Sequence, residues 1–572
     1  MAETLISPGV LARENDSSFI GAPPITFGAA IIGPAVKGPV GIPTAVSSFS
    51  QYEAIFGSTV QSGSQYYTYL NSAAAQNYFT QGGESLLVTR VVSGSLSTAW
   101  AEASSSIGNS NAGNGAILTT ADLVGLITTN TSDGTNGVYN NVAVGGGSGT
   151  SAQATVTVAG NVVTSIQFTA GGTGYLVSEV LTFSSGTIGG TTNVEITLNA
   201  AALAREEAFS LKTISEGTIM NNYSAAGDNA NGTLVSGSQD NIRWEVTGAN
   251  TSSGQFSLSI RRGNDTSTQK AVLEQYNNLS MDPNATNYVA KAIGNTYYTV
   301  EQDGVDYYVK SNGDYPNRSA YVFLGSVNTP TPEYFNNDGS AKNEFTGSLP
   351  IPGSGSFEGA LGENVSSAQS PAKFNENITA GNIQGLIAND YTQSIKLLNN
   401  TDAYSFNVIS APGLIHSLHS SQVNLLVNLA EARTDCLAVV DLVPYNSTVG
   451  TVSTQATSFD SSYAATYWPW LQSIDPNSGQ YVWSPASVFI PGVYAFTDAS
   501  SDPWFAPAGL IRGALGNVVK AERKLTSGNR DTLYEANVNP IATFPGSGTV
   551  VFGQKTLQKK ASALDRVNVR RL

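Results

Sequence analysis

Few residues of this 572-residue chain are of types that carry out chemistry. The sequence holds one Cys and two His, so no disulfide can form within the chain and no Cys/His zinc cluster is available. His416 and His419 are three residues apart and could share a helical face, but two imidazoles without a nearby carboxylate make a poor metal site. Cys436 opens an apolar stretch, where an inert buried thiol is the usual state. We therefore expect neither a metal nor any other cofactor.

Charged residues gather around one predicted strand. Asp441 lies near the C-terminal end of the apolar stretch 436–443, the position where α/β enzymes place catalytic groups. Glu431, Arg433 and Asp435 come just before this stretch, where a structural ion pair explains them better than catalysis. No GxSxG, HExxH, DFG or paired-carboxylate signature accompanies them. The sequence therefore predicts that the protein is not an enzyme, and a hydrolase stays a weak alternative.

The elements that must position these residues alternate between helix and strand, which is the rhythm of an α/β sheet. In the second half, helices are expected at 383–398 and 421–433, and strands at 404–409 and 436–443. Near the start, a strand is expected from Ile25, a helix at 65–80 and a buried strand at 85–92. The middle of the chain instead shows period-two alternation and Gly-rich turns. Strands are expected there at 244–248, 256–262 and 297–300, and a helix at 200–208.

Composition limits the function classes. Charged residues make up only 12% of the chain, about half the usual level of roughly 25%, which suits a surface covered by neighbouring subunits. The net charge of −15 argues against nucleic acid as a partner. No run of 18 apolar residues exists, so no direct membrane insertion is expected. The start, MAETLISPGV, lacks the features of a secretory signal.

Several stretches match one protein family, in order along the chain. They include LISPGVLARENDSS, AAIIGPAVKGPVGIPTAVSSFSQYEAIFG, LEQYNNLSMDPNATNYVAKAIG, LLNNTDAYSFNVISAPGL, EARTDCLAVVDLV, SSYAATYWPWLQSIDPNSGQYVWSPAS, WFAPAGLIRGAL, RDTLYEANVNPIATFPGSGTVVFGQKTL and DRVNVRRL. Through them the chain resembles the contractile-tail sheath proteins of bacteriophages, the myovirus-type tail sheath family. Residues 99–205 lie outside the resemblance.

The resemblance implies a structural subunit that polymerises helically around the tail tube and contracts to drive the tube through the host cell envelope. It implies four partners: further copies of the chain, the tail tube protein, the baseplate and the tail terminator. The protein is then expected in the virion, after assembly in the cytoplasm of the host bacterium. One alternative is a sheath subunit of a bacterial contractile injection system. Another is a glycan-binding virion surface protein, suggested by the β-rich residues 100–205.

The predicted fold class is α/β (α+β) and multidomain, with an α/β sheath core built from both chain ends. The expected parts are an N-terminal linking arm (1–22), the core (23–90 with 376–490), a β-rich second domain (91–99 with 206–375), an outward-facing all-β insertion (100–205) and a C-terminal polymerisation domain (491–572). The resemblance also implies that the natural protein continues beyond Leu572.

The N-terminal arm is expected to link subunits. Residues 4–19 are too polar to hold themselves on their own body, so we expect them to add a β-strand to another subunit or to the C-terminal module. Sixteen residues reach roughly 50 Å. Leu5, Val10 and Leu11 are the expected apolar anchors between subunits.

The C-terminal end is basic. Residues 512–572 hold 11 of the 27 Lys and Arg but 4 of the 42 Asp and Glu, so their net charge is +7 and that of residues 1–511 is −22. Lys520, Arg523 and Lys524, here called the basic triad, would share one face if 518–525 is helical. We expect this face to contact the tail tube or an adjacent subunit, with a solvated helix face as the alternative.

Overall fold

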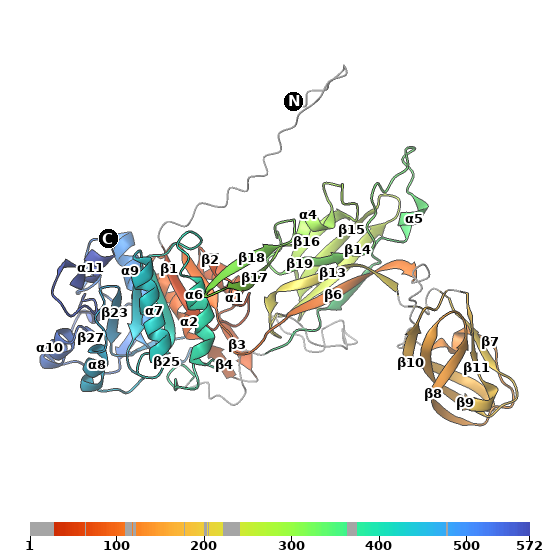
Figure 1. Ribbon diagram of the computed structural model, residues 1–572, viewed down its shortest axis with the longest axis horizontal. Coiled ribbons are helices and arrows are strands. Elements are labelled where there is room, and N and C mark those ends of the chain that lie inside the picture. Colours follow the sequence, from red (N-terminus) through yellow and green to blue (C-terminus); the bar gives the residue numbers. More distant parts are fainter. Residues whose placement is uncertain are drawn as a thin grey trace, which may run out of the picture.

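The molecule is elongated, with an α/β core at one end, a β-rich second domain in the middle and a small β-sheet domain at the other end (Figure 1). This computed structural model describes residues 28–62, 65–108, 117, 122–176, 178–199, 203, 205–220, 241–362, 374–475 and 479–571. The predicted N-terminal arm lies outside these residues. The predicted α/β, multidomain fold class is confirmed.

The core is an eight-stranded sheet that joins the two ends of the chain. Its strands, in spatial order, are β2 (Thr44–Val46), β5 (Leu86–Arg90), β1 (Ala29–Gly33), β21 (Val408–Ile415), β22 (Leu437–Asp441), β23 (Ala464–Trp468), β27 (Asn539–Phe544) and β28 (Gly548–Val551). The six strands from β5 to β27 run parallel, and β2 and β28 are antiparallel edges. Every residue of β1, β21, β22 and β23 is buried, as expected for parallel strands covered on both faces.

Helices pack around this sheet and close its hydrophobic core. They are α1 (Phe49–Phe56), α2 (Leu70–Thr80), α6 (Tyr391–Leu397), α7 (Ser420–Arg433), α8 (Val449–Ala456), α9 (Ile490–Ser500), α10 (Ser527–Glu535) and α11 (Val567–Arg570). Helices α6 and α7 pack together in front of the sheet in the view of Figure 1, and α2 packs on α9. Side-chain caps fix the first residue of some of these helices. The hydroxyl of Ser48 accepts from the backbone N–H of Gln51 at the start of α1, and Thr526 and Asn529 form a capping box at the start of α10.

Residues beyond 491 share the hydrophobic core of the sheet. Strand β27 pairs with β23, and Leu533, Ile541 and Val551 are buried in the same cluster as residues of β1 and β21. The predicted boundary at 491 is therefore not a boundary between separate hydrophobic cores. Two small sheets complete this part of the molecule: β3 (Thr59–Ser62) with β4 (Gln65–Thr68), and β24 (Leu471–Ile474) between β25 (Tyr481–Ser484) and β26 (Val518–Ala521).

The second domain has its own core between two antiparallel sheets. One sheet holds β19 (Val322–Val327), β13 (Arg205–Glu216) and β6 (Thr98–Gly108), and the other holds β16 (Val272–Ser280), β15 (Gln255–Arg262), β14 (Ile242–Asn250) and β20 (Gly353–Ser356). Short helices α4 (Val289–Ile293) and α5 (Asn343–Thr346) accompany them. The hairpin of β17 (Tyr297–Asp303) and β18 (Asp306–Asn312) reaches back to α6 of the core.

The third domain is a six-stranded antiparallel sheet with a separate hydrophobic core. Its strands, in spatial order, are β10 (Val162–Thr173), β9 (Thr150–Ala159), β8 (Gly137–Gly146), β11 (Val180–Phe183), β12 (Val194–Thr197) and β7 (Ile127–Thr129), with α3 (Ser185–Ile188) beside them. It is inserted between β6 and β13, where Gly108 and Arg205 are cross-strand partners. The insertion begins after residue 108 and not at the predicted residue 100, because residues up to 108 belong to β6 of the second domain.

Three predicted helices need correction. Residues 65–68 form a strand, and α2 begins only at Leu70. Residues 205–208 begin strand β13, and the part of the predicted helix at 200–202 and 204 lies outside the described residues. Residues 383–387 form turns before α6. In each case the apolar spacing suited a helix, but other structure prevailed. Residues 65–68 pair with the neighbouring strand β3, residues from 205 on pair with the distant strand β6, and Ile383 and Leu386 close a local turn.

Candidate functional site

The basic triad does not lie on a helix, so the condition under which its members would share one helical face is not met. Lys520 belongs to β26, which pairs with β24 so that Lys520 faces Gln472 across the ladder. Its ammonium lies 5.6 Å from the centre of the Trp483 ring, and the other two members follow in the turn after the strand. All three side chains are exposed. Contact of the triad with a tail tube or a neighbouring subunit stays a prediction.

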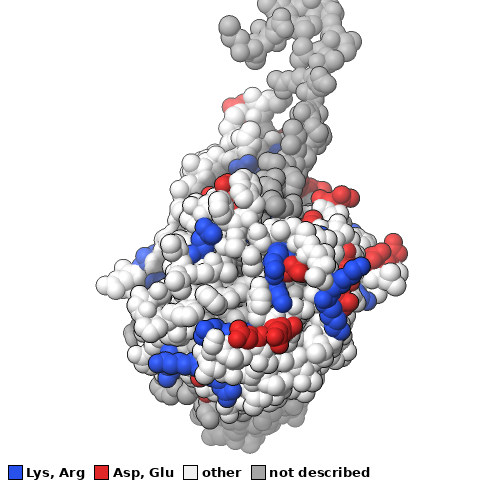
Figure 2. Space-filling model, turned by 90° about the vertical axis from the view of Figure 1, so that its left-hand side faces the viewer, with Lys and Arg blue, Asp and Glu red and all other residues white. Residues whose placement is uncertain are grey.

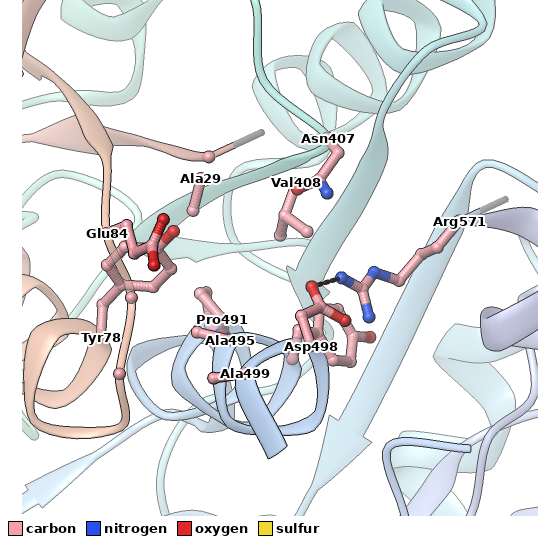
Figure 3. A pocket seen from close by; sticks show the side chains of 14 residues that line it. Ala29, Tyr78, Glu84, Asn407, Val408, Pro491, Ala495, Asp498, Ala499 and Arg571 are labelled. Carbon is pink, nitrogen blue, oxygen red and sulfur yellow. Dashed lines mark hydrogen bonds and ion pairs between the residues drawn. The ribbon is translucent and has the colours of Figure 1, made fainter. Parts of the chain in front are cut away.

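The three arm residues Leu5, Val10 and Leu11 lie outside the described residues, so their role also stays a prediction. The described chain starts at Gly28, on the wall of a cavity of about 180 Å³. Figure 3 shows this cavity between α2, α9 and the amino ends of β1 and β21, with Glu84 on one side and the ion pair of Asp498 and Arg571 on the other. Gly28 and Arg571, the first and last described residues, therefore line one cavity at the amino ends of the central strands β1 and β21.

Asp441 ends β22 in a buried position. Its carboxylate accepts hydrogen bonds from the hydroxyl of Ser487, at 2.5 Å, and from the backbone N–H of the same residue, at 3.2 Å. Burial raises the pKa of Asp441 to about 7, and the two hydrogen bonds from Ser487 oppose this rise. The cavity beside it measures about 10 Å³, which is too small for a substrate. The residue joins β22 to the segment before α9 and is not placed for catalysis.

The two histidines serve the packing of β21 and its neighbours. The Nδ1 atom of His419 accepts from the backbone N–H of Ile415 at 3.1 Å, while its Nε2 atom lies 3.0 Å from the carbonyl oxygen of Thr379. His416 hydrogen bonds to Gln455 at 3.0 Å. Burial lowers the pKa of both imidazoles. Across the described ranges, no group of three His, Cys, Asp or Glu side chains could hold a metal ion.

The cluster before β22 is a structural ion pair. Arg433 is buried at the end of α7 and forms a two-point salt bridge with Asp435, at 3.0 and 2.8 Å. It also donates to the carbonyl oxygens of Leu398 and Tyr404, both at 2.7 Å. Burial raises the pKa of the Cys436 thiol to about 12, which leaves it an unreactive thiol at neutral pH. The hydrogen bonds of Arg433 thus connect the end of α7 to the loop before β21.

A groove of about 990 Å³ separates the core from the second domain. Tyr297 and Tyr298 from β17 line it and are half exposed. The amides of Asn295 and Asn317, which also line it, are engaged by the backbone of neighbouring turns. Burial raises the pKa of Glu216, at the junction, to about 7. The bonds of the two asparagines lie within the second domain. Across the junction, Arg90 of the core donates to the carbonyl oxygen of Glu216 at 3.0 Å, and the N–H of Gly38 donates to the hydroxyl of Ser215 at 2.9 Å.

A surface that the sequence did not single out as a site lies in the segment before β26. Residues 502–511, here called the apolar loop, expose Trp504, Phe505, Leu510 and Ile511 by 54, 40, 52 and 81%. The sequence signal is a run of large apolar residues interrupted by two prolines and a glycine, a pattern of turns rather than of a buried strand. Within the described ranges, no helix combines the length and apolar composition of a membrane-crossing segment.

The sequence is similar to tail sheath proteins over part of its length. Residues 374–557 match the family model of the phage tail sheath protein central domain. The tail sheath protein of Vibrio phage KVP40 is 29% identical over 32% of this chain and 31% of its own length. That of Enterobacteria phage T4 is 32% identical over 26% of this chain and 25% of its own length. The sheath tail protein of Listeria innocua aligns over 95% of this chain and 72% of that chain, at 9% identity and a TM-score of 0.42.

The chain matches about a quarter to a third of the length of these curated relatives. The matched range 374–557 contains β21 to β23, β27 and β28 of the core sheet, together with the apolar loop and the basic triad. The predicted resemblance is thus confirmed by the family model and by three curated tail sheath proteins. Residues 374–557 of the chain therefore carry the phage tail sheath protein central domain.

Proposed function

We propose that this chain is the structural subunit of a contractile tail sheath, which polymerises helically around a tail tube and contracts to drive the tube through the host envelope. The observation that carries the proposal is the sheath central domain at residues 374–557. It supplies five strands of the eight-stranded sheet, so the matched part includes most of the core.

The side-chain arrangement supports a structural role, and we propose that the protein is not an enzyme. Asp441, His416, His419 and Cys436 are each buried and committed to packing or hydrogen bonds within the core. Contraction needs no bound nucleotide if the extended sheath is held behind a kinetic barrier and the contracted packing is more stable.

The proposed partners are further copies of this chain, the tail tube protein, the baseplate and the tail terminator. The proposed location is the virion, after assembly in the host cytoplasm. We also propose that residues 1–22 link subunits, that the basic triad faces the tube or a neighbour, and that the inserted domain points outward from the sheath. The distance between the inserted domain and the core sheet in Figure 1 supports this last point.

Glycan binding receives less support from the inserted domain. Sugar-binding surfaces commonly use exposed aromatic rings as stacking platforms. Among the described residues of this domain, Phe168, Tyr175 and Phe183 are buried and Tyr139 is half-buried. Its exposed large apolar side chains are valines, namely Val138, Val162 and Val180.

Negative-stain electron microscopy of the purified protein tests the proposal. We expect tubes with a regular helical lattice, at protein concentrations where a sedimentation experiment shows large assemblies. Discrete compact particles at every concentration and salt condition would contradict a sheath subunit.

A further inference from the structure

The apolar loop presents large apolar side chains on a rigid support. Ile511 and Trp504 are exposed by 81% and 54%, with Leu510 and Phe505 beside them. Folded monomers seldom leave such a group of neighbouring apolar side chains in water, and exposed patches of this kind usually mark contact surfaces.

The backbone of the loop is fixed on the edge of the core sheet. The N–H of Gly509 donates to the carbonyl oxygen of Val551 at 2.8 Å, and the N–H of Val551 donates to Gly513 at 2.8 Å. A Cβ atom at Gly513 would lie 2.5 Å from the Val551 oxygen, so only glycine permits this approach. The carbonyl oxygen of Trp504 accepts from the amide of Asn568 at 2.9 Å.

Arg512 also holds the apolar loop in place, through one hydrogen bond and one ring contact. Its Nε–H donates to the carbonyl oxygen of Ala506 at 3.1 Å, and its guanidinium lies 4.8 Å from the centre of the Phe505 ring. The apolar side chains are thus held in place before any partner arrives, which reduces the ordering entropy lost on binding. A preorganised surface of this kind suits a specific partner.

We propose that the apolar loop docks onto a second copy of this chain; this rests on the proposed function and names a contact between sheath subunits. Charge identifies the occupant. The segment 512–572, which begins at the loop, carries a net charge of +7, and the rest of the chain carries −22. Figure 2 shows the end of the core that carries this segment as mostly uncharged surface, with scattered Lys and Arg and several Asp and Glu among them. The net positive charge of this segment favours a partner of net negative charge, and residues 1–511 of another copy have that sign.

The same charge asymmetry sets the geometry of the contact. A loop-to-loop contact would bring together two copies of the segment 512–572, each with a net charge of +7, and this repulsion disfavours such a contact. The loop then meets a different surface of a second copy, and such a heterologous contact propagates into an open polymer. The mostly uncharged loop supplies the contact, and the surrounding charges orient it.

Ile511→Asp tests the docking surface. This side chain is almost fully exposed, so the change should leave the folded subunit intact while placing a charge in the contact. We expect the protein concentration needed for tube formation to rise at least tenfold. Val305→Asp is the matched control, since Val305 is 74% exposed at the turn between β17 and β18; it should shift that concentration less than twofold. Circular dichroism melting confirms that both variants are folded.

A photocrosslinking amino acid at position 511 identifies the occupant. We expect a covalent dimer of the chain in assembled tubes. Tubes that form equally well from Ile511→Asp, or a probe that reacts with the tube protein and not with another copy, would overturn the docking proposal and leave the sheath function standing. If the protein with the photocrosslinker at position 511 crosslinks to another copy while neither it nor wild type ever forms tubes, the docking surface is supported and the sheath function is contradicted.

Discussion

Replacing Asp441 with Asn should remove a pH dependence of stability from the core. The carboxyl group has a pKa of 3.8 in the unfolded chain and about 7 in the folded protein, because burial disfavours its charge. The folded state therefore holds this proton more tightly, so its stabilising effect is complete below about pH 3.8 and is lost as pH rises to 7. The difference corresponds to at most about 4 kcal/mol of unfolding free energy. Asn keeps an oxygen that accepts from the backbone N–H of Ser487, and it cannot ionise.

The measurement is urea unfolding of wild type and Asp441→Asn at several values between pH 5 and 8, followed by the near-ultraviolet signal of the core tryptophans. The variant should gain stability relative to wild type as pH rises, by a few kcal/mol over this range. Asp402→Asn, at an exposed position, controls for the loss of a surface charge. If wild type and Asp441→Asn show the same pH dependence, the carboxyl group does not titrate in this window and the account of its burial is wrong.

Four further predictions concern assembly and packing. Replacing residues 109–204 with a two-residue turn should leave tubes intact, because the flanking strand ends are already paired; insoluble protein would show that the domain partition is wrong. Removing residues 1–19 should abolish polymerisation with little change in melting temperature, and contractile tubes from the truncated protein would refute the linking role. Reversing the three charges of the basic triad should weaken sheath–tube association, most at low salt, where unchanged cosedimentation would reject the idea. Arg433→Met should lower the unfolding free energy by about 2–4 kcal/mol in urea titrations, since it leaves the carbonyl groups of Leu398 and Tyr404 without their donor; a loss below about 1 kcal/mol would contradict this.

Much of the core could be predicted from the sequence because its signals are local. The helix expected at 421–433 is α7, one residue longer. The strand expected at 436–443 is β22, whose five residues are all buried. An apolar run of this length next to a helical period leaves little ambiguity. The ion pair before β22 could also be predicted, since Arg433 and Asp435 lie two positions apart in the sequence.

The remaining features depend on residues that are distant in sequence. Residues 518–521 form a strand because β24 offers a partner, while the spacing of the basic triad suggested a helix. The hydroxyl that meets Asp441 belongs to Ser487, 46 positions away. The exposure of Trp504 and Ile511 could not be predicted either, since large apolar side chains are normally assigned to the interior.

The parallel pairing of β1 with β21 has a consequence for biosynthesis. Ile31 pairs with Ser410, so the central partner of the first core strand is translated almost 380 residues later. At about 5–20 residues per second, the ribosome needs roughly 20–75 seconds to deliver it. During that interval the apolar strands β1 and β5 have no completed sheet to enter, and they are hazards for aggregation. The nascent chain should therefore depend on chaperones of the cell that makes it until the second half emerges, so chaperone capacity limits the yield of this protein.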